Sequence, residues 1–355
     1  MAYTTIDDPS AHFQTVTYSG NGSTQSITND GNSDLQPDWI WFKNITNSPR
    51  DHVLIDSTRG VDLSLYSNQT KGDQSLTDVM SSFNSDGFSL ESNVRANESS
   101  QTHVAWQWKA NGGTTTSTNA SGSTGDNTDI IASVRQTNTT AGFSIITYTG
   151  DSTAGKKVTH GLGATPEFII VRNRDNNSEP WGVFTTLTGV KALALNSNAA
   201  QATDSGYWSD TLPDSTHFTV GSHGSTGAAA AFVAYAFTGI QGYSKFGSYK
   251  GNGNADGTFI YLGFKPKYFL LKSSSATQHW YVFDTARDTF NPSNSAQQAS
   301  GNTAQETGYP MDFLSNGFKI RHSDGAWNGS GSTYIYMAFA EHPFVSSKGV
   351  PVTAR

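Results

Sequence analysis

One short phrase occurs three times in the chain and constrains its fold more than any other feature. Each copy has a Leu, then a Pro, an aromatic residue and a short apolar run. Each closes on a base six residues after the Pro, at Lys43, Arg172 and Lys272. The copies read LQPDWIWFK (35–43), LGATPEFIIVR (162–172) and LGFKPKYFLLK (262–272). Three ordered copies of one phrase indicate one structural unit used three times.

The similarity extends well beyond this phrase. Each copy is preceded by an aromatic-led segment that runs into Gly: FQTVTYSGNG, FSIITYTGD and FGSYKGNG. Each is followed by an aromatic closing segment: THVAWQW, AFVAYAF and YIYMAFA. The distance from the Pro to the Ala of the closing segment is 68, 68 and 72 residues. A unit of about 95 residues exceeds a solenoid repeat of about 20–50 residues and fits an independent small domain.

The pattern within each unit favours strands. Segments of 4–8 residues rich in Val, Ile, Thr, Phe and Tyr alternate with Gly, Asn and Ser clusters. The pairs Asp-Gly in SDGF and Asn-Gly in SNGF suit tight turns between strands. The Ala-rich STGAAAAFVAYAF is also assigned to a strand, because its counterparts in the other units are strand-like. We predict an all-β protein with three tandem β-sandwich domains of the jelly-roll type.

The opening phrase then has a structural explanation. Pro has no N–H to donate to a neighbouring strand. At the entrance of a strand this costs nothing, because no ladder hydrogen bond is needed there. A run that is apolar on both faces suits the central strand of a sandwich. We expect the closing Lys or Arg to reach solvent where the strand leaves the core.

The predicted organisation follows from these boundaries. It comprises an N-terminal attachment segment (1–12), unit 1 (13–110), a flexible polar linker (111–142), unit 2 (143–239), unit 3 (240–343) and a C-terminal tail (344–355). Within the linker, DIIASV could form a short extra strand.

Composition excludes several classes of protein. Charged residues make up 14% of the chain and the net charge is −7, with no acidic or basic block, so we expect no nucleic-acid partner. The absence of Cys excludes disulfides, zinc-thiolate sites and thiol nucleophiles. No run approaches the ~20 apolar residues of a membrane helix, and the start shows no signal peptide. We expect a soluble protein without membrane insertion.

The chain also contains no recognisable catalytic motif. The nine His residues are scattered, without metal-site spacing. Asp56 and Arg59 in unit 1 match Asp284 and Arg287 in unit 3, whereas unit 2 has Thr185 in place of the Asp. We interpret these as structural ion pairs and predict no enzyme activity, no metal and no cofactor.

Two Trp residues are the candidates for ligand binding. Trp208 (GYWSD) and Trp327 (GAWNGS) occupy loop-like contexts that the other units do not repeat. An exposed indole there could stack on a sugar ring while polar neighbours such as Asn328 bind its hydroxyls. The alternative is that each indole plugs one end of a sandwich. Trp181 and Trp280 match each other and are assigned to the core. The pairs Trp39/Trp41 and Trp106/Trp108 could be core or an exposed stacking platform.

A weak metal candidate is the loop NGNADG. Asn252, Asn254 and Asp256 alternate before Gly257 as at the start of a calcium loop. The loop lacks the closing Glu of an EF-hand, so we favour a hairpin turn.

Four passages carry a resemblance to a known family: MAYTTIDDPSAHFQTVTYSGNGS, HVAWQWKANGG, GYSKFGSYKGNGNADGTFIYLGFKPKYFLLK and YIYMAFAEHPFVSSKGVPVTAR. Together they resemble structural proteins of marine tailed bacteriophages, which include virion structural and tail-fibre-like proteins. The likeness covers essentially the whole chain. It implies a virion component and brings no catalytic motif.

Three hypotheses follow. In the first, the protein is a tail or fibre component, exposed on the exterior of a virion assembled in the host cytoplasm. It contacts other virion proteins and binds host cell-surface glycan, as a homo-oligomer with a trimer favoured. In the second, it is a capsid decoration or cement protein that docks through residues 1–12 or unit 1. In the third, which no motif favours, it is a glycan-degrading tail enzyme.

Overall fold

The regular secondary structure of the chain is almost entirely β-strand. The computed structural model describes residues 2–120 and 129–352. Within them the helical elements are short: η1 (Pro9–Ala11), α1 (Val94–Asn97) and α2 (Ser205–Trp208). The predicted all-β class is confirmed, and the Ala-rich segment supplies a strand, β18 (Ala231–Phe237), as expected. No helix in the described ranges has the length and apolarity needed to cross a membrane.

The strands follow one another with short connections. Unit 1 contains β1 (Phe13–Ser19), β2 (Gln25–Ile27), β3 (Trp39–Asn44), β4 (Val53–Asp56), β5 (Leu63–Ser64), β6 (Gln74–Ser75), β7 (Met80–Phe83), β8 (Phe88–Leu90) and β9 (Thr102–Trp108). The segment 111–142 contains β10 (Thr116–Thr118) and β11 (Ser133–Asn138). Unit 2 contains β12 (Phe143–Thr149), β13 (Lys156–Thr159), β14 (Phe168–Asn173), β15 (Gly182–Thr185), β16 (Gly189–Ala194), β17 (His217–Val220) and β18. Unit 3 contains β19 (Ser244–Lys250), β20 (Phe259–Tyr261), β21 (Phe264–Ser273), β22 (Tyr281–Asp284), β23 (Ser293–Gln298), β24 (Glu306–Leu314), β25 (Gly317–Ile320) and β26 (Thr333–Pro343).

The three large sheets contain the same strand order. It is β1-β9-β3-β4 in unit 1, β12-β18-β14-β15 in unit 2 and β19-β26-β21-β22 in unit 3. Smaller sets of strands, β2-β8-β7, β13-β17 and β24-β25-β20, complete the sandwich-like units. The registers also correspond, because Trp39 pairs with Trp108 and Asp56, and Tyr268 pairs with Phe339 and Asp284. Residues can therefore be matched between units by register.

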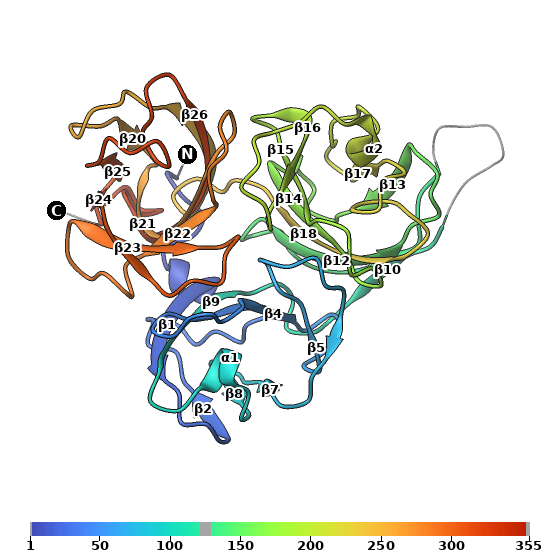
Figure 1. Ribbon diagram of the computed structural model, residues 1–355, viewed down its shortest axis with the longest axis horizontal. Coiled ribbons are helices and arrows are strands. Elements are labelled where there is room, and N and C mark those ends of the chain that lie inside the picture. The colour runs from blue at the N-terminus through green and yellow to red at the C-terminus, as the bar shows by residue number, and fades with distance from the viewer. Residues whose placement is uncertain (1, 121–128, 353–355) are drawn as a thin grey trace.

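The three units meet at a common centre. Figure 1 shows unit 1 in blue below, unit 2 in green and unit 3 in orange and red, as three lobes. One cluster of buried side chains draws residues from all three units, and three further clusters each centre on one unit. Along β3, Trp39 and Trp41 belong to the shared cluster, whereas Ile40 and Phe42 face the interior of unit 1. Because successive side chains of a strand point to opposite faces, this explains why the run is apolar on both faces.

The segment 111–142 differs from the flexible linker that we predicted. β10 and β11 extend the sheet of unit 2, with β11 paired to β12 along its length. The extra strand expected at DIIASV therefore begins later, at Ser133. Residues 121–128, which belong to the same predicted linker, lie outside the described residues.

The prolines of the repeated phrase lie where their missing N–H is tolerated. Pro37 and Pro166 each stand two residues before a strand, as predicted. Pro266 instead lies within β21, at an irregularity in the pairing with β26. Proline inside a sheet is found mainly at such bulges.

The expectation that the closing bases reach solvent is wrong. Lys43, Arg172 and Lys272 are all 0% exposed, because loops cover the end of each central strand and supply carbonyl oxygens to the cation. Lys43 Nζ donates to Arg50 O at 2.7 Å, and Lys272 Nζ donates to Ser273 O at 2.7 Å. Arg172 Nε donates to Lys71 O of unit 1 at 3.1 Å. Burial lowers the pKa of Lys43 to about 7 and that of Lys272 to about 8.

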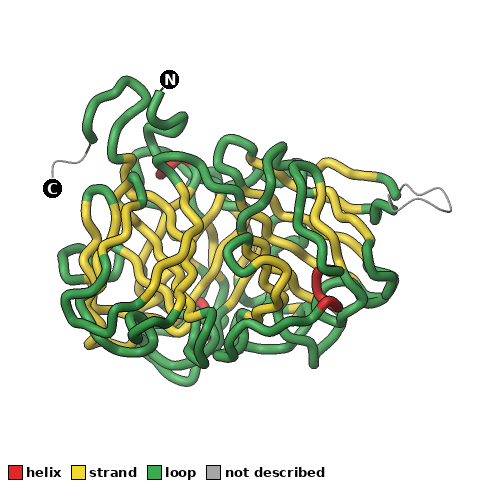
Figure 2. The backbone as a smooth tube through the Cα atoms, turned by 90° about the horizontal axis from the view of Figure 1, so that it is seen from above, coloured by secondary structure: helices red, strands yellow, loops and turns green. Residues whose placement is uncertain are grey.

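The two terminal segments lie together at one edge of the molecule (Figure 2). Thr4 Oγ1 donates to Gln241 O of unit 3 at 2.8 Å, and the side chain of Ile6 is buried. Ser347 N donates to Asp7 Oδ1 at 2.6 Å, which ties the C-terminal tail to the N-terminal segment. Both segments are thus packed against unit 3.

Candidate functional site

The structure rules out Trp208 and Trp327 as exposed ligand-binding residues. Their side chains are 1% and 2% exposed, so neither can stack on a sugar. Trp208 packs edge-on against Phe184 with ring centroids 5.6 Å apart, and the rings of Trp327 and Tyr281 are 4.1 Å apart. Each indole fills the interior of its own sandwich, which was the alternative considered from the sequence. The pairs Trp39/Trp41 and Trp106/Trp108 are likewise core.

Asn328 is also buried, and its amide stabilises the turn at residues 252–254 through hydrogen bonds. Its Nδ2 donates to Asn252 Oδ1 at 2.8 Å and Asn254 O at 2.7 Å, and its Oδ1 accepts from Asn252 N at 2.9 Å. These bonds leave the amide without capacity for a ligand. Asn97 of unit 1 does the same, since its Oδ1 accepts from Asn21 N at 2.9 Å over the same separation of 76 residues.

The candidate metal loop is a turn stabilised by its own side chains, but it is not the hairpin that we favoured, because β19 pairs with β26 and β20 pairs with β25. Asn254 N donates to Asn252 Oδ1 at 3.0 Å, and Asp256 N donates to Asn254 Oδ1 at 2.9 Å. The carboxylate of Asp256 is ion-paired with Lys319 Nζ at 2.6 Å, and this contact lowers the pKa of Asp256. Across the described residues no group of three His, Cys, Asp or Glu could hold a metal ion.

The interpretation of the Asp–Arg pairs is confirmed. Arg59 Nε lies 2.6 Å from Asp56 Oδ2, and Arg287 Nε lies 2.6 Å from Asp284 Oδ2, with all four side chains buried. Each carboxylate also accepts a hydrogen bond from another unit, which the sequence did not show. These donors are Tyr235 OH to Asp56 at 2.8 Å and Trp106 Nε1 to Asp284 at 3.0 Å. The pairs therefore join units.

A second set of contacts closes the three units into a ring. At matching positions, a ring nitrogen of one unit lies at hydrogen-bond distance from a carbonyl oxygen of the next. The contacts are His52 Nε2 to Gln298 O (2.8 Å), Trp181 Nε1 to Tyr66 O (3.0 Å) and Trp280 Nε1 to Ala194 O (2.9 Å). Trp41 Nε1 donates to His52 Nδ1 at 2.8 Å, so Nε2 carries the proton and donates. Each unit is therefore bonded to both of its neighbours.

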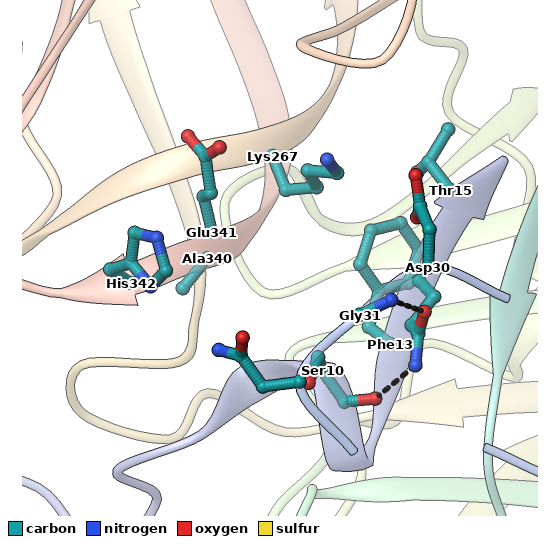
Figure 3. A pocket seen from close by; sticks show the side chains of 11 residues that line it. Ser10, Phe13, Thr15, Asp30, Gly31, Lys267, Ala340, Glu341 and His342 are labelled. Carbon is teal, nitrogen blue, oxygen red and sulfur yellow. Dashed lines mark hydrogen bonds between the residues drawn. The ribbon is translucent and has the colours of Figure 1, made fainter. Parts of the chain in front are cut away.

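A polar cavity of about 200 Å³ opens between units 1 and 3. Its walls are the start of β1, residues 30–32, Lys267 of β21 and residues 340–342 of β26. Figure 3 shows Lys267, Glu341 and His342 on one side and Thr15 and Asp30 on the other. Gln14 fixes the loop, because its Oε1 accepts from Gly31 N at 2.9 Å and its Nε2 donates to Ser33 O at 2.7 Å. A Cβ at Gly31 would come within 2.6 Å of the Gln14 side chain, so a larger residue there would displace the Gln14 amide.

A second feature of unit 3 is an exposed aromatic pair. Phe259 and Tyr261 of β20 are 43% and 48% exposed, and β20 forms an edge of its sheet. The two side chains share the outer face, since Ile260 between them is buried. Lys245 Nζ lies 5.5 Å from the centroid of the Tyr261 ring and donates to Tyr261 O at 2.7 Å. Tyr3 OH lies 3.1 Å from Tyr261 OH, so the ring is held from two sides.

The sister units show that the fold does not require these aromatics. Ile260 pairs with Phe318 as Ile27 pairs with Phe88 and Val158 pairs with Phe218. On either side of these apolar residues stand Ser26 and Thr28 in unit 1, Lys157 and Thr159 in unit 2, and Phe259 and Tyr261 in unit 3. Exposed aromatic rings at these positions are therefore specific to unit 3.

Comparison with known proteins identifies a family. A family model described as a domain of unknown function (DUF7483) matches residues 8–343, which include all three units. The chain belongs to this family. No curated protein and no solved structure matches it. The DUF7483 match contains the cavity walls and β20, so both candidate surfaces lie within the span that defines the family.

Sequence reasoning missed both surfaces of this DUF7483 protein. The alternation in Phe259-Ile260-Tyr261 is visible, and comparison with Ser26-Ile27-Thr28 would have identified aromatics outside the common core. The cavity has no comparable signal, because its walls come from segments more than 200 residues apart.

Proposed function

We propose that the protein is a structural component of a tailed-bacteriophage virion, exposed on the tail or its fibres, that contributes to host attachment by binding cell-surface glycan. The observation that carries the glycan-binding role is the aromatic pair on β20, which is exposed only in unit 3. The resemblance to phage structural proteins supports the virion assignment.

The geometry of the pair suits a sugar chain. Residues i and i+2 of a strand are separated by about 7 Å and point to the same side. Aromatic rings offer a flat, electron-rich face to the C–H groups of a pyranose. Lys245 and Tyr3 hold the Tyr261 ring in place, which reduces the entropy lost on binding. Partial burial against the Tyr261 ring, which positions the Lys245 side chain, also lowers the pKa of Lys245.

The same surface supports binding rather than hydrolysis. Glycoside hydrolysis commonly uses two carboxyl groups beside the scissile bond. Two acids close to β20 are engaged by cations, Asp256 with Lys319 at 2.6 Å and Asp312 with Arg321 at 2.5 Å. In a fibre we expect a homotrimer, which would strengthen weak contacts through avidity.

A capsid decoration protein is the second candidate. The observation that favours it is the compact three-lobed body with one shared core, which shows no fibrous extension among residues 2–120 and 129–352. Such a body would suit a site of local threefold symmetry on a capsid lattice. The two candidates differ in copy number and in position on the particle.

Binding is tested with the purified full-length chain and polysaccharide from the host cell envelope. The double variant Phe259→Ser/Tyr261→Thr copies unit 1 and should fold normally, but we expect its affinity to fall at least about tenfold. Phe290→Ser is the control, because Phe290 is 84% exposed and lies outside β20. Unchanged binding by the double variant, or no binding by the wild type, would contradict the proposal.

A further inference from the structure

We propose that the cavity between units 1 and 3 binds a single neutral sugar residue. This inference rests on the proposed function, because it assigns a second contact to the same class of ligand. It is carried by unit-specific backbone geometry and by polar groups in the cavity that have no partner.

The cavity exists because unit 3 departs from its sisters. The pairing of β3 with β9 ends at Trp39 and Trp108, whereas β21 and β26 continue beyond the corresponding residues to Phe264 and Pro343. The register shifts in this extension, and the pairing skips Lys267 and Glu341. Bulges commonly re-aim side chains beside binding sites. Both skipped residues line the cavity (Figure 3).

Lys267 replaces a carboxylate that has a structural task in the other units. By register its counterparts are Asp38 and Glu167. Asp38 Oδ2 accepts from Ala110 N at 2.7 Å, and Glu167 Oε1 accepts from Gly239 N at 2.8 Å, so each holds the chain that leaves its unit. Lys267 cannot accept such bonds. Its ammonium has no hydrogen-bond or ion-pair partner within the part of the chain that the structure describes, which leaves it free for a ligand.

Thr15 is the second unpartnered group. Its side chain is 2% exposed and its Oγ1 is buried without a hydrogen-bond partner among the described residues. A buried hydroxyl that makes no bond costs about 1–3 kcal/mol. Glu341 Oε2 lies 2.6 Å from Lys265 Nζ but makes no hydrogen bond of acceptable geometry within the same described residues, so it retains acceptor capacity. A ligand that both donates and accepts would satisfy these groups.

The charge balance selects a neutral, polyhydroxylated ligand. The carboxylates of Asp30 and Glu341 offset the positive charges of Lys265 and Lys267. A phosphate or a carboxylate ligand would be repelled by these two acids, and a cationic ligand would be repelled by Lys267. Sugar hydroxyls can accept from Lys267 and donate to Glu341. Phe13 and Ala340 supply an apolar wall for the ring carbons.

The test uses saturation-transfer NMR on the full-length chain with D-glucose, D-galactose, D-mannose and N-acetyl-D-glucosamine as separate probes. We expect one of these sugars to bind, and Thr15→Val and Lys267→Met each to weaken its binding at least about tenfold. Thr17→Val, at an exposed position two residues further along the same strand, and Lys250→Met, at an exposed position of β19, should leave binding unchanged.

The outcomes separate this inference from the proposed function. A cavity that holds only water would give no signal with any of the four sugars and would overturn the inference. A signal that the Thr15 and Lys267 variants leave intact would also overturn it. In either case, polysaccharide binding that depends on Phe259 and Tyr261 would leave the proposed function standing.

Discussion

The phenol of Tyr235 donates a 2.8 Å hydrogen bond to Oδ2 of Asp56, a residue 179 positions earlier in the chain. Arg59 neutralises the same carboxylate at 2.6 Å, so a buried acid of unit 1 has its partners in two units. Trp106 and Asp284 repeat the arrangement between units 1 and 3. By register the third equivalent would join Met337 to Thr185, and Met337 has no proton to donate. Unit 2 therefore lacks the buried Asp at the position where unit 3 offers no side-chain donor to it.

Tyr235→Phe should lower the free energy of unfolding by about 1–3 kcal/mol, because it removes a donor from a buried carboxylate. Tyr268→Phe is the matched control. Tyr268 is equally buried, but its hydroxyl has no partner among the residues described, so its loss should be nearly neutral. Urea unfolding of both variants provides the measurement. Equal effects would show that the Tyr235 contact contributes nothing specific.

Asp284→Thr should be far more harmful, at about 3–5 kcal/mol, because it leaves the Arg287 guanidinium buried without its counter-ion. Unit 2 lacks both members of the pair, with Thr185 and Thr188 in their places. The double variant Asp284→Thr/Arg287→Thr should therefore be more stable than the single variant by at least about 1 kcal/mol. Thermal unfolding compares the two. A double variant less stable than the single one would refute the ion-pair account.

Lowering the pH should destabilise the protein already in the range where most carboxylates are still ionised. Burial lowers the pKa of His103 and of His160 to about 4, and it holds the pKa of His52 well below the usual range. The unfolded chain, with His near 6.5, binds more protons than the folded chain between these values, so stability falls as pH drops from about 6.5 to 4. Urea midpoints measured across this range test the prediction, and His160→Gln should reduce the slope. A midpoint independent of pH between 7 and 5 would contradict it.

Unit 1 should not be a well-behaved protein on its own. Trp39, Trp41, Trp106 and Trp108 are at most 1% exposed in the chain and belong to the core shared by all units. A fragment of residues 13–110 would expose this aromatic face to water, and large apolar patches promote association. Sedimentation velocity should show the fragment self-associating while the full chain gives one defined species. A monodisperse, cooperatively unfolding fragment would show that the units are independent.

The sequence carried the fold class because strand length, alternation and turn residues are local signals. The partner against which each apolar face packs cannot be read from the local sequence. The run from Trp39 to Phe42 reads as the centre of one sandwich, although its Trp face packs against other units. Lys43 reads as exposed because its position at the end of an apolar run does not show that the following loop folds back and supplies Arg50 O to its ammonium. Phe259 and Tyr261 were within reach of an internal comparison, because their counterparts in unit 1 are Ser26 and Thr28.

Immunogold labelling of intact virions with antibody to this chain tests the central claim most directly. The account predicts sparse gold confined to the tail or its fibres, as expected for an attachment protein present in few copies. Dense gold over the head would contradict that placement and favour a decoration protein. Unlabelled particles would contradict the virion assignment itself.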